Sequence, residues 1–168
     1  MSEAMNTLVC AVLIGAGATA VLDVWTFVRR HLLGIASLDY GLVGRWFAHI
    51  ARGRFRHDAI SAASPVRGEC VIGWTAHYLS GIAFAFALLA IWGLGWVRQP
   101  TLGPALIVGI GSVVAPFLLM QPGMGAGIAA SHTPQPAAAR MRSLIAHGIF
   151  GLGLYLAGWA LSSFVAKP

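Results

Sequence analysis

The sequence predicts an all-α membrane protein, a bundle of four transmembrane helices with a cytoplasmic amphipathic helix in its first loop. Of the 168 residues, 58% are hydrophobic and only 10% are charged, whereas soluble domains carry about 25% charged residues. Four apolar stretches are each long enough to cross about 30 Å of hydrocarbon. The arginines are concentrated between these stretches, where the polar loops of a membrane protein lie.

The whole chain, 1–168, is predicted to form a single transmembrane domain. Its first span has no Lys or Arg before it and two arginines directly after it, which is the reverse of a cleaved signal peptide. Pro116 lacks an amide proton and should kink the third span, while Pro136 is suited to open the last helix. The predicted spans are about 7–28, 71–96, 101–120 and 143–165.

The distribution of basic residues predicts the orientation. The loop after the first span contains seven arginines, and the loop after the third span contains Arg140 and Arg142. The opposite side has Arg98 and Lys167. Because Lys and Arg are enriched in cytoplasmic loops, both termini are predicted to lie outside. The net charge of +6 is explained by these loops, so no nucleic-acid partner is expected.

Within the first loop, residues 39–52 are predicted to form an amphipathic helix capped by Asp39. Its apolar face carries Trp46, and Arg45 and Arg52 lie mainly on the other side. This pattern is typical of a helix in the headgroup layer, where arginines bind anionic lipid phosphates and an indole lies at the interface. A helix packed over the end of the bundle is an equal alternative.

Three ionisable residues, Asp23, His77 and His147, lie inside the apolar spans. Such a side chain costs several kcal/mol in hydrocarbon, so each one points to an interior partner or a water-filled cavity. Small residues share their helix faces, which predicts that the three side chains converge near the cytoplasmic side. Glu69, about two turns before His77, is a candidate to join them.

The sequence leaves three uses of this polar layer open. A hydrogen-bond network would fix the register of the helices. Two imidazoles and one carboxylate also suit a divalent metal, with Asp23, His77 and His147 as ligands, and the imidazoles suit haem iron. A proton or ion pathway is the third interpretation. The chain has no compact metal-binding motif, so the prediction depends on depth and helix face alone.

A glycine-rich segment, QPGMGAG, follows the third span. Its glycines disfavour a regular helix. Unpaired backbone at membrane depth is tolerated only where it is buried in protein or lines a cavity. Cavity-lining backbone is therefore predicted at Gln121, Gly123, Met124 and Gly125, although a simple exit loop fits the pattern equally well.

Three segments of the chain carry a resemblance to a known family. They are GATAVLDVWTF, DYGLVGRWFAHIARGRFRH and APFLLMQPGMGAGIAASHTPQPAAARMRSLIAHGIFGLGLY, and their more specific parts are QPGMG, TPxP and RxRSLxxH. They resemble a small bacterial inner-membrane family catalogued only as a domain of unknown function. The resemblance covers nearly the whole chain. It implies a bacterial multi-pass protein and supplies no activity, substrate or cofactor.

Three functions fit these features. The first is a small transporter or channel component with the Asp/His layer on its path, in a homo-oligomer because four helices are few for a pathway. The second is a metal- or haem-binding membrane redox protein. The third is a non-catalytic scaffold or accessory subunit that binds membrane lipids or a partner through the basic loop. No sequence motif predicts a catalytic residue, so an enzyme is the less favoured class.

Overall fold

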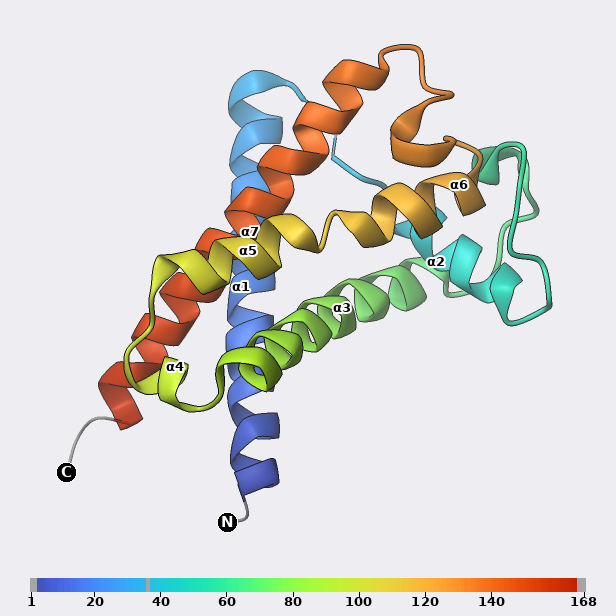
Figure 1. Cartoon of the computed structure of the whole chain (residues 1–168). Coiled ribbons are helices and arrows are strands. Elements are labelled where there is room, and N and C mark those ends of the chain that lie inside the picture. Colours follow the sequence, from blue (N-terminus) through green and yellow to red (C-terminus); the bar gives the residue numbers. More distant parts are fainter. Residues whose placement is uncertain (1–2, 36, 166–168) are drawn as a thin grey trace. The chain divides into compact units, whose positions relative to one another are not determined.

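Helices form all the regular secondary structure in residues 3–35 and 37–165, which are the residues that this computed structural model describes. The short elements η1 and η3 are 3-10 helices and η2 is a π-helix. The prediction of an all-α protein is confirmed. In chain order the elements are α1 (Glu3–Leu33), α2 (Tyr40–Ile50), η1 (Ile60–Ala62), α3 (Glu69–Trp92), α4 (Gly95–Arg98), α5 (Leu102–Gly111), η2 (Pro116–Met120), α6 (Gln121–Met124), η3 (Ile128–Ala130) and α7 (Pro136–Val165) (Figure 1).

Four helical segments are long and apolar enough to cross a membrane, which confirms the predicted number of spans. They are Glu3–Leu33, Glu69–Trp92, Leu102–Met124 and Pro136–Ser163. The second span is shorter than predicted because α3 ends at Trp92, and the predicted far end of that span is the separate helix α4. The last helix begins at Pro136, as predicted. Lys167, counted in the predicted orientation, lies outside the described residues.

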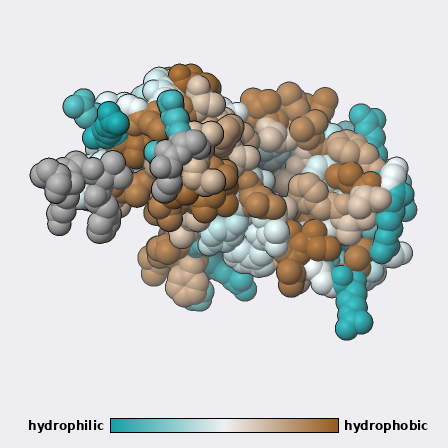
Figure 2. All heavy atoms as spheres, turned by 90° about the horizontal axis from the view of Figure 1, so that it is seen from below, coloured by the Kyte–Doolittle hydropathy of each residue, from teal (hydrophilic) through white to brown (hydrophobic). Residues whose placement is uncertain are grey.

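Large apolar side chains are exposed along all four spans. Examples are Phe27 at 63% exposed, Ile91 at 68%, Ile107 at 64% and Trp159 at 60%. Figure 2 shows one face of the molecule, on which hydrophobic atoms cover much of the visible surface. Apolar patches of this extent are unstable in water and suit contact with lipid chains. The exposed side chains and the helix lengths together indicate a multi-pass membrane protein.

The chain divides into two compact units. The first contains α1, most of α3, α4, α5 and most of α7, from residues up to 37, 78–112 and from 146 onward. The second contains α2, the loop after it, the start of α3, and residues 113–145. Each unit contains its own group of polar contacts.

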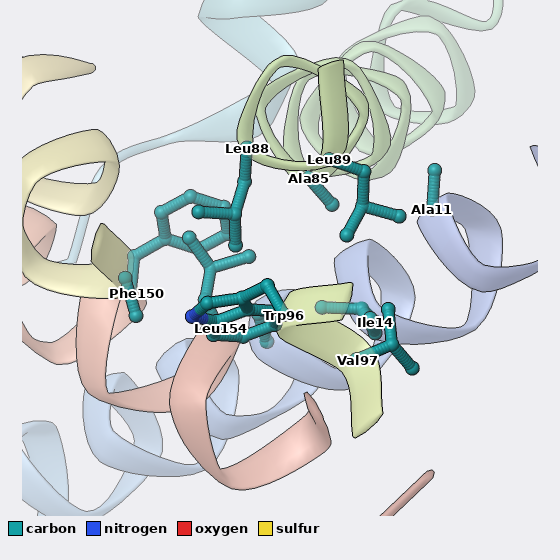
Figure 3. Close-up of a cluster of buried hydrophobic side chains, with 11 residues drawn as sticks. Ala11, Ile14, Ala85, Leu88, Leu89, Trp96, Val97, Phe150 and Leu154 are labelled. Atoms are coloured by element: carbon teal, nitrogen blue, oxygen red, sulfur yellow. The ribbon is translucent and has the colours of Figure 1, made fainter. Parts of the chain in front are cut away.

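The core of the first unit is made of apolar side chains from α1, α3, α4, α5 and α7. Ile14, Leu88 and Leu154 are completely buried there. Figure 3 shows Trp96 of α4 among these side chains, together with Phe150 of α7. The Trp96 indole nitrogen donates to the carbonyl of Thr101 at 3.2 Å, so its one polar atom is satisfied inside the core. This core holds the helices that carry the polar residues of the first unit.

The third span has an irregular middle. Helix α5 ends at Gly111, residues 112 and 113 form a turn, and the π-helix begins at Pro116. Pro116 has no N–H to donate to the carbonyl four residues earlier, which belongs to Ser112. Without that hydrogen bond the regular helix is interrupted, and the wider π-helical turn follows. The predicted irregularity at Pro116 is therefore present.

Candidate functional site

In the first unit, a polar pair lies on the contact between α1 and α3. The two helices approach closely here, because a Cβ placed on Gly81 would collide with the Thr19 hydroxyl. The Thr19 hydroxyl donates to the carbonyl of Gly15 at 2.8 Å. One turn farther along both helices, the Tyr78 hydroxyl donates to the Asp23 carboxylate at 3.0 Å. Asp23 therefore faces a neighbouring helix, as its position among small residues predicts.

A second polar pair lies on the contact between α5 and α7. A Cβ on Gly109 would collide with the backbone of Gly151, so these two helices also touch at glycine. One turn farther, the Ser112 hydroxyl lies 2.6 Å from the Gly109 carbonyl oxygen and 2.6 Å from His147 Nδ1. The hydroxyl has one proton, which it donates to the carbonyl because a carbonyl can only accept. His147 therefore donates its Nδ1 proton to Ser112.

The two pairs share one arrangement, which we call the seam pairs: Asp23 with Tyr78, and His147 with Ser112. In each, a titratable side chain bonds to a hydroxyl on the neighbouring helix, one turn beyond a crossing of small residues. Asp23 follows the crossing on α1, whereas Tyr78 precedes it on α3. Ser112 and His147 have the same order on α5 and α7, so the two helices of each pair run antiparallel. The Asp23–Tyr78 pair lies in the C-terminal half of α1, and the His147–Ser112 pair lies at the C-terminal end of α5.

His77, the third predicted intramembrane residue, belongs to the second unit. Its Nε2 lies 3.0 Å from the hydroxyl of Tyr40 on α2. The two rings also pack together with centroids 4.4 Å apart, and Trp74 packs against both. Like the residues of the seam pairs, His77 is thus bonded to a hydroxyl on another helix.

The predicted metal site gains no support from the described residues. Among them, no three His, Cys, Asp or Glu side chains lie close enough together to hold a metal ion. Asp23 and His147 have different hydroxyl partners in the first unit, while His77 lies in the second. A metal held by all three stays a prediction, as does a haem.

Arg45 has its partners inside the second unit. Its Nη2 and Nε bind the two carboxylate oxygens of Glu69 at 2.8 and 2.9 Å. Its Nη1 lies 3.4, 3.3 and 3.1 Å from the carbonyl oxygens of Ile60, Ser61 and Ala63. The hydrogen bonds that Arg45 donates to Glu69 are the main cause that raises the pKa of Arg45 above its usual value; partial desolvation opposes this rise and the carboxylate charge adds to it. The guanidinium is thus fully engaged by the protein.

The contacts of Arg45 lie within the protein, so its predicted contact with lipid phosphates gains no support and stays a prediction. The interface prediction for Trp46 gains no support either, because Trp46 is only 5% exposed, lies against Gly123 and donates to the carbonyl of Phe55 at 2.8 Å. Helix α2 is capped by Asp39 as predicted. Its contacts favour the alternative of a helix packed on protein. A salt bridge and backbone carbonyls let α2 bury the charged side chain of Arg45.

The glycine-rich segment is packed against the loop after α2. Gln121 and Met124 bound the short helix α6, and the backbone N–H of His57 donates to the Gly123 carbonyl at 3.0 Å. Gly125 has φ of +96° and lies against the Asp58 carbonyl, so both its backbone angle and its surroundings exclude a side chain. The Gln121 side-chain oxygen is buried and has no partner among the described residues. This backbone is bound to protein, and its lining of a cavity stays a prediction.

A family model described as a protein of unknown function matches residues 12–161. The chain belongs to the DUF2938 family. The match includes both seam pairs and the whole second unit of this DUF2938 protein. Neither a curated protein nor a solved structure matches the chain.

Arg52 is exposed in the DUF2938 chain, unlike Arg45. Arg54 and Arg56 are exposed beside it, and the Phe55 side chain between them is 42% exposed. We call these four residues the arginine loop. Basic and aromatic side chains at one exposed site retain the features of a lipid-headgroup contact. The lipid-interface prediction therefore stays open for Arg52, now together with Arg54, Phe55 and Arg56.

Sequence reasoning missed several polar residues of the DUF2938 chain. Tyr78 and Ser112 each bond to a titratable partner, and His49 and His57 form a buried pair. Tyr78 lies three residues before Gly81 and Ser112 three residues after Gly109. The only sequence signal for these two hydroxyls was their position on the same helix face as the small residues. His57 lies in an irregular loop and offered no such signal.

Proposed function

We propose that this DUF2938 protein is a component of a small oligomeric transporter or channel of the bacterial inner membrane, with the seam pairs on the path of a proton or small ion. The hydrogen bond from Tyr78 to Asp23 is the observation that carries this proposal. Both residues lie within candidate spans. A carboxylate there costs several kcal/mol, and intramembrane carboxylates commonly mark ion or proton pathways.

The chemistry of the partners supports a proton as the moving species. A hydroxyl both donates and accepts hydrogen bonds, so it can receive a proton on one side while it gives one up on the other. Each seam pair combines such a hydroxyl with a group that titrates, a carboxylate in Asp23 and an imidazole in His147. Each pair can therefore hold or release a proton without moving a helix.

The assembly and orientation are part of the proposal. Four helices are few to enclose a pathway, and the many exposed apolar side chains leave area for contacts between copies of the chain. The seven arginines of the first loop favour a cytoplasmic position for that loop, with both termini outside. Peptide tags at either terminus should bind antibody added to spheroplasts. A tag that becomes accessible only after lysis would contradict the orientation.

The transport proposal is tested with purified protein in proteoliposomes that contain a pH-sensitive dye. Wild type should dissipate an imposed pH gradient, and Asp23→Asn or Tyr78→Phe should abolish that flux. Tyr155→Phe is a matched control, because Tyr155 also lies in a span and its hydroxyl has no hydrogen bond among the described residues. Wild type without proton or monovalent-ion flux, or variants that conduct normally, would contradict the proposal.

We propose a lipid-bound scaffold or accessory subunit as the second function, because one observation favours it. The arginine loop exposes three guanidinium groups around a partly exposed aromatic ring. Juxtamembrane basic residues bind anionic headgroups, each with about 1 kcal/mol near the membrane surface. In this case the seam pairs would stabilise helix contacts, and their replacement would leave partner or lipid binding unchanged.

A further inference from the structure

In the second unit, two histidines form a buried pair outside the predicted site. His49 on α2 and His57 in the following loop are 7% and 6% exposed. His49 Nδ1 lies 2.8 Å from His57 Nε2, within hydrogen-bonding distance. The ring centroids are 5.0 Å apart at an interplanar angle of 44°, so the contact is edge to edge through nitrogen rather than stacked.

The outer nitrogens of the pair both face backbone carbonyl oxygens. His49 Nε2 lies 3.1 Å from the carbonyl oxygen of Ser64. His57 Nδ1 lies 3.2 Å from the carbonyl oxygen of Gly123. A carbonyl oxygen only accepts hydrogen bonds, so each of these two nitrogens must carry a proton to bond. The geometry thus fixes the protonation of both outer positions.

The two inner nitrogens then require a third proton. Two neutral imidazoles carry two protons in all, and both are used by the outer bonds. Without a third, the inner nitrogens would place two lone pairs against each other at 2.8 Å. A neutral pair can form the inner hydrogen bond only if one outer nitrogen gives up its proton. That nitrogen then turns its lone pair toward a carbonyl oxygen, which is also unfavourable. Buried polar atoms are rarely left in such contacts.

We propose that the His49–His57 pair is a proton-binding site that holds one proton between its rings and carries a single positive charge. The bound proton joins three segments: helix α2, the loop around Ser64 and the glycine-rich segment at Gly123. Loss of the proton removes one hydrogen bond from this junction. The site lies outside the seam pairs, so it goes beyond the proposed transport function and does not depend on it.

The charged groups around the pair are compatible with this charge. Glu69, at the start of α3, lies close enough to His49 for their charges to interact, and it also binds Arg45. Arg56 and Asp58 flank His57 in the loop, and both are exposed. The glycine-rich segment and η1 present backbone rather than titratable side chains to this region. The negative charge of Glu69 and the two carbonyl oxygens favour the added proton.

Nitrogen-15 NMR of histidine-labelled protein in nanodiscs tests this site directly. The expected result is three protonated ring nitrogens in the pair and a coupling between His49 Nδ1 and His57 Nε2 across the hydrogen bond. His31 is exposed on α1 and serves as an internal reference for a ring outside the pair. Two protonated ring nitrogens in the pair instead of three, with no coupling between the rings, would overturn the proposal.

Variants assign the signals and provide the control. His49→Gln should abolish the coupling, while His31→Gln should leave the coupling intact. If His49→Gln does not fold, the coupling still identifies the pair in wild type, because it connects only the two nitrogens that share a proton. A coupling that survives His49→Gln would contradict the assignment.

Discussion

The Tyr78 hydroxyl donates to the Asp23 carboxylate at 3.0 Å, one turn beyond the crossing where Gly81 meets Thr19. The same order recurs between α5 and α7, where Ser112 and His147 follow the contact of Gly109 with Gly151. Close backbone approach at small residues brings the next side chains within hydrogen-bonding distance. The small-residue crossings therefore position the titratable groups.

Replacement of Tyr78 by Phe should lower the stability of the helix contact modestly. The change removes one hydroxyl and keeps the ring, so the loss should be about 0.6 kcal/mol and at most about 1.7 kcal/mol, the range for hydrogen bonds between membrane helices. Unfolding in mixed SDS micelles measures it, with Tyr155→Phe as the control. Equal losses in the two variants would show that the bond to Asp23 contributes nothing specific.

The crossing of α5 and α7 should be intolerant of a single added methyl group. In Gly109→Ala the new Cβ meets the backbone of Gly151, which cannot move aside as a side chain could, so about 1–3 kcal/mol should be lost. Gly111→Ala on the same helix meets nothing within 4 Å and should be neutral or stabilising by up to about 1 kcal/mol. The same unfolding assay compares the two variants. Similar stabilities of Gly109→Ala and Gly111→Ala would contradict the close contact between α5 and α7.

The four spans could be predicted from sequence because length and hydropathy alone determine them. The partners of the intramembrane residues could not, because they depend on which helices cross. Asp23 was expected to meet His77 and His147, which stays a prediction, while its hydrogen bond with Tyr78 was not foreseen because Tyr78 lies 55 positions away and carries no charge. Periodicity places a side chain on a face and does not name its neighbour.

For α2, the amphipathic pattern left packing on protein as an equal alternative to the inference that Arg45 lies toward lipid. That inference assumed that a charged side chain avoids the protein interior, which fails when its charge is matched. Glu69, 24 positions away, and three carbonyl groups of the loop provide the match. A single sequence does not reveal such a pairing, because the carbonyls come from the short 3-10 helix η1 and the residue that ends it, which have no clear sequence pattern.

Replacement of Arg45 by Met should detach the loop after α2. It would leave the Glu69 carboxylate without its bidentate partner and would free the three carbonyl groups that Arg45 binds. Cleavage of the loop by proteinase K in inverted vesicles should become much faster. Arg52→Met is the control, because Arg52 is exposed and its loss should change little.

The double variant Arg45→Met, Glu69→Met separates two causes of this effect. If the unpaired carboxylate is the main defect, removal of both charges should restore much of the protease resistance, since an apolar pair often replaces a buried ion pair without loss. If the carbonyl contacts dominate, the double variant should be cleaved as fast as Arg45→Met. Equal resistance of wild type and Arg45→Met would contradict the structural role of the ion pair.

Replacement of Arg52, Arg54 and Arg56 by Gln should weaken the preference of the protein for anionic lipids. Each guanidinium near a charged bilayer surface contributes about 1 kcal/mol, and the effect should shrink as ionic strength rises because salt screens exposed charges. Native mass spectrometry of protein released from mixed nanodiscs counts the anionic and zwitterionic lipids that stay bound. The matched triple Lys variant keeps the charge and should keep most of the preference. If the Gln variant retains the same anionic lipids as wild type, the arginine loop is not a headgroup site, and the scaffold function loses the observation that favours it.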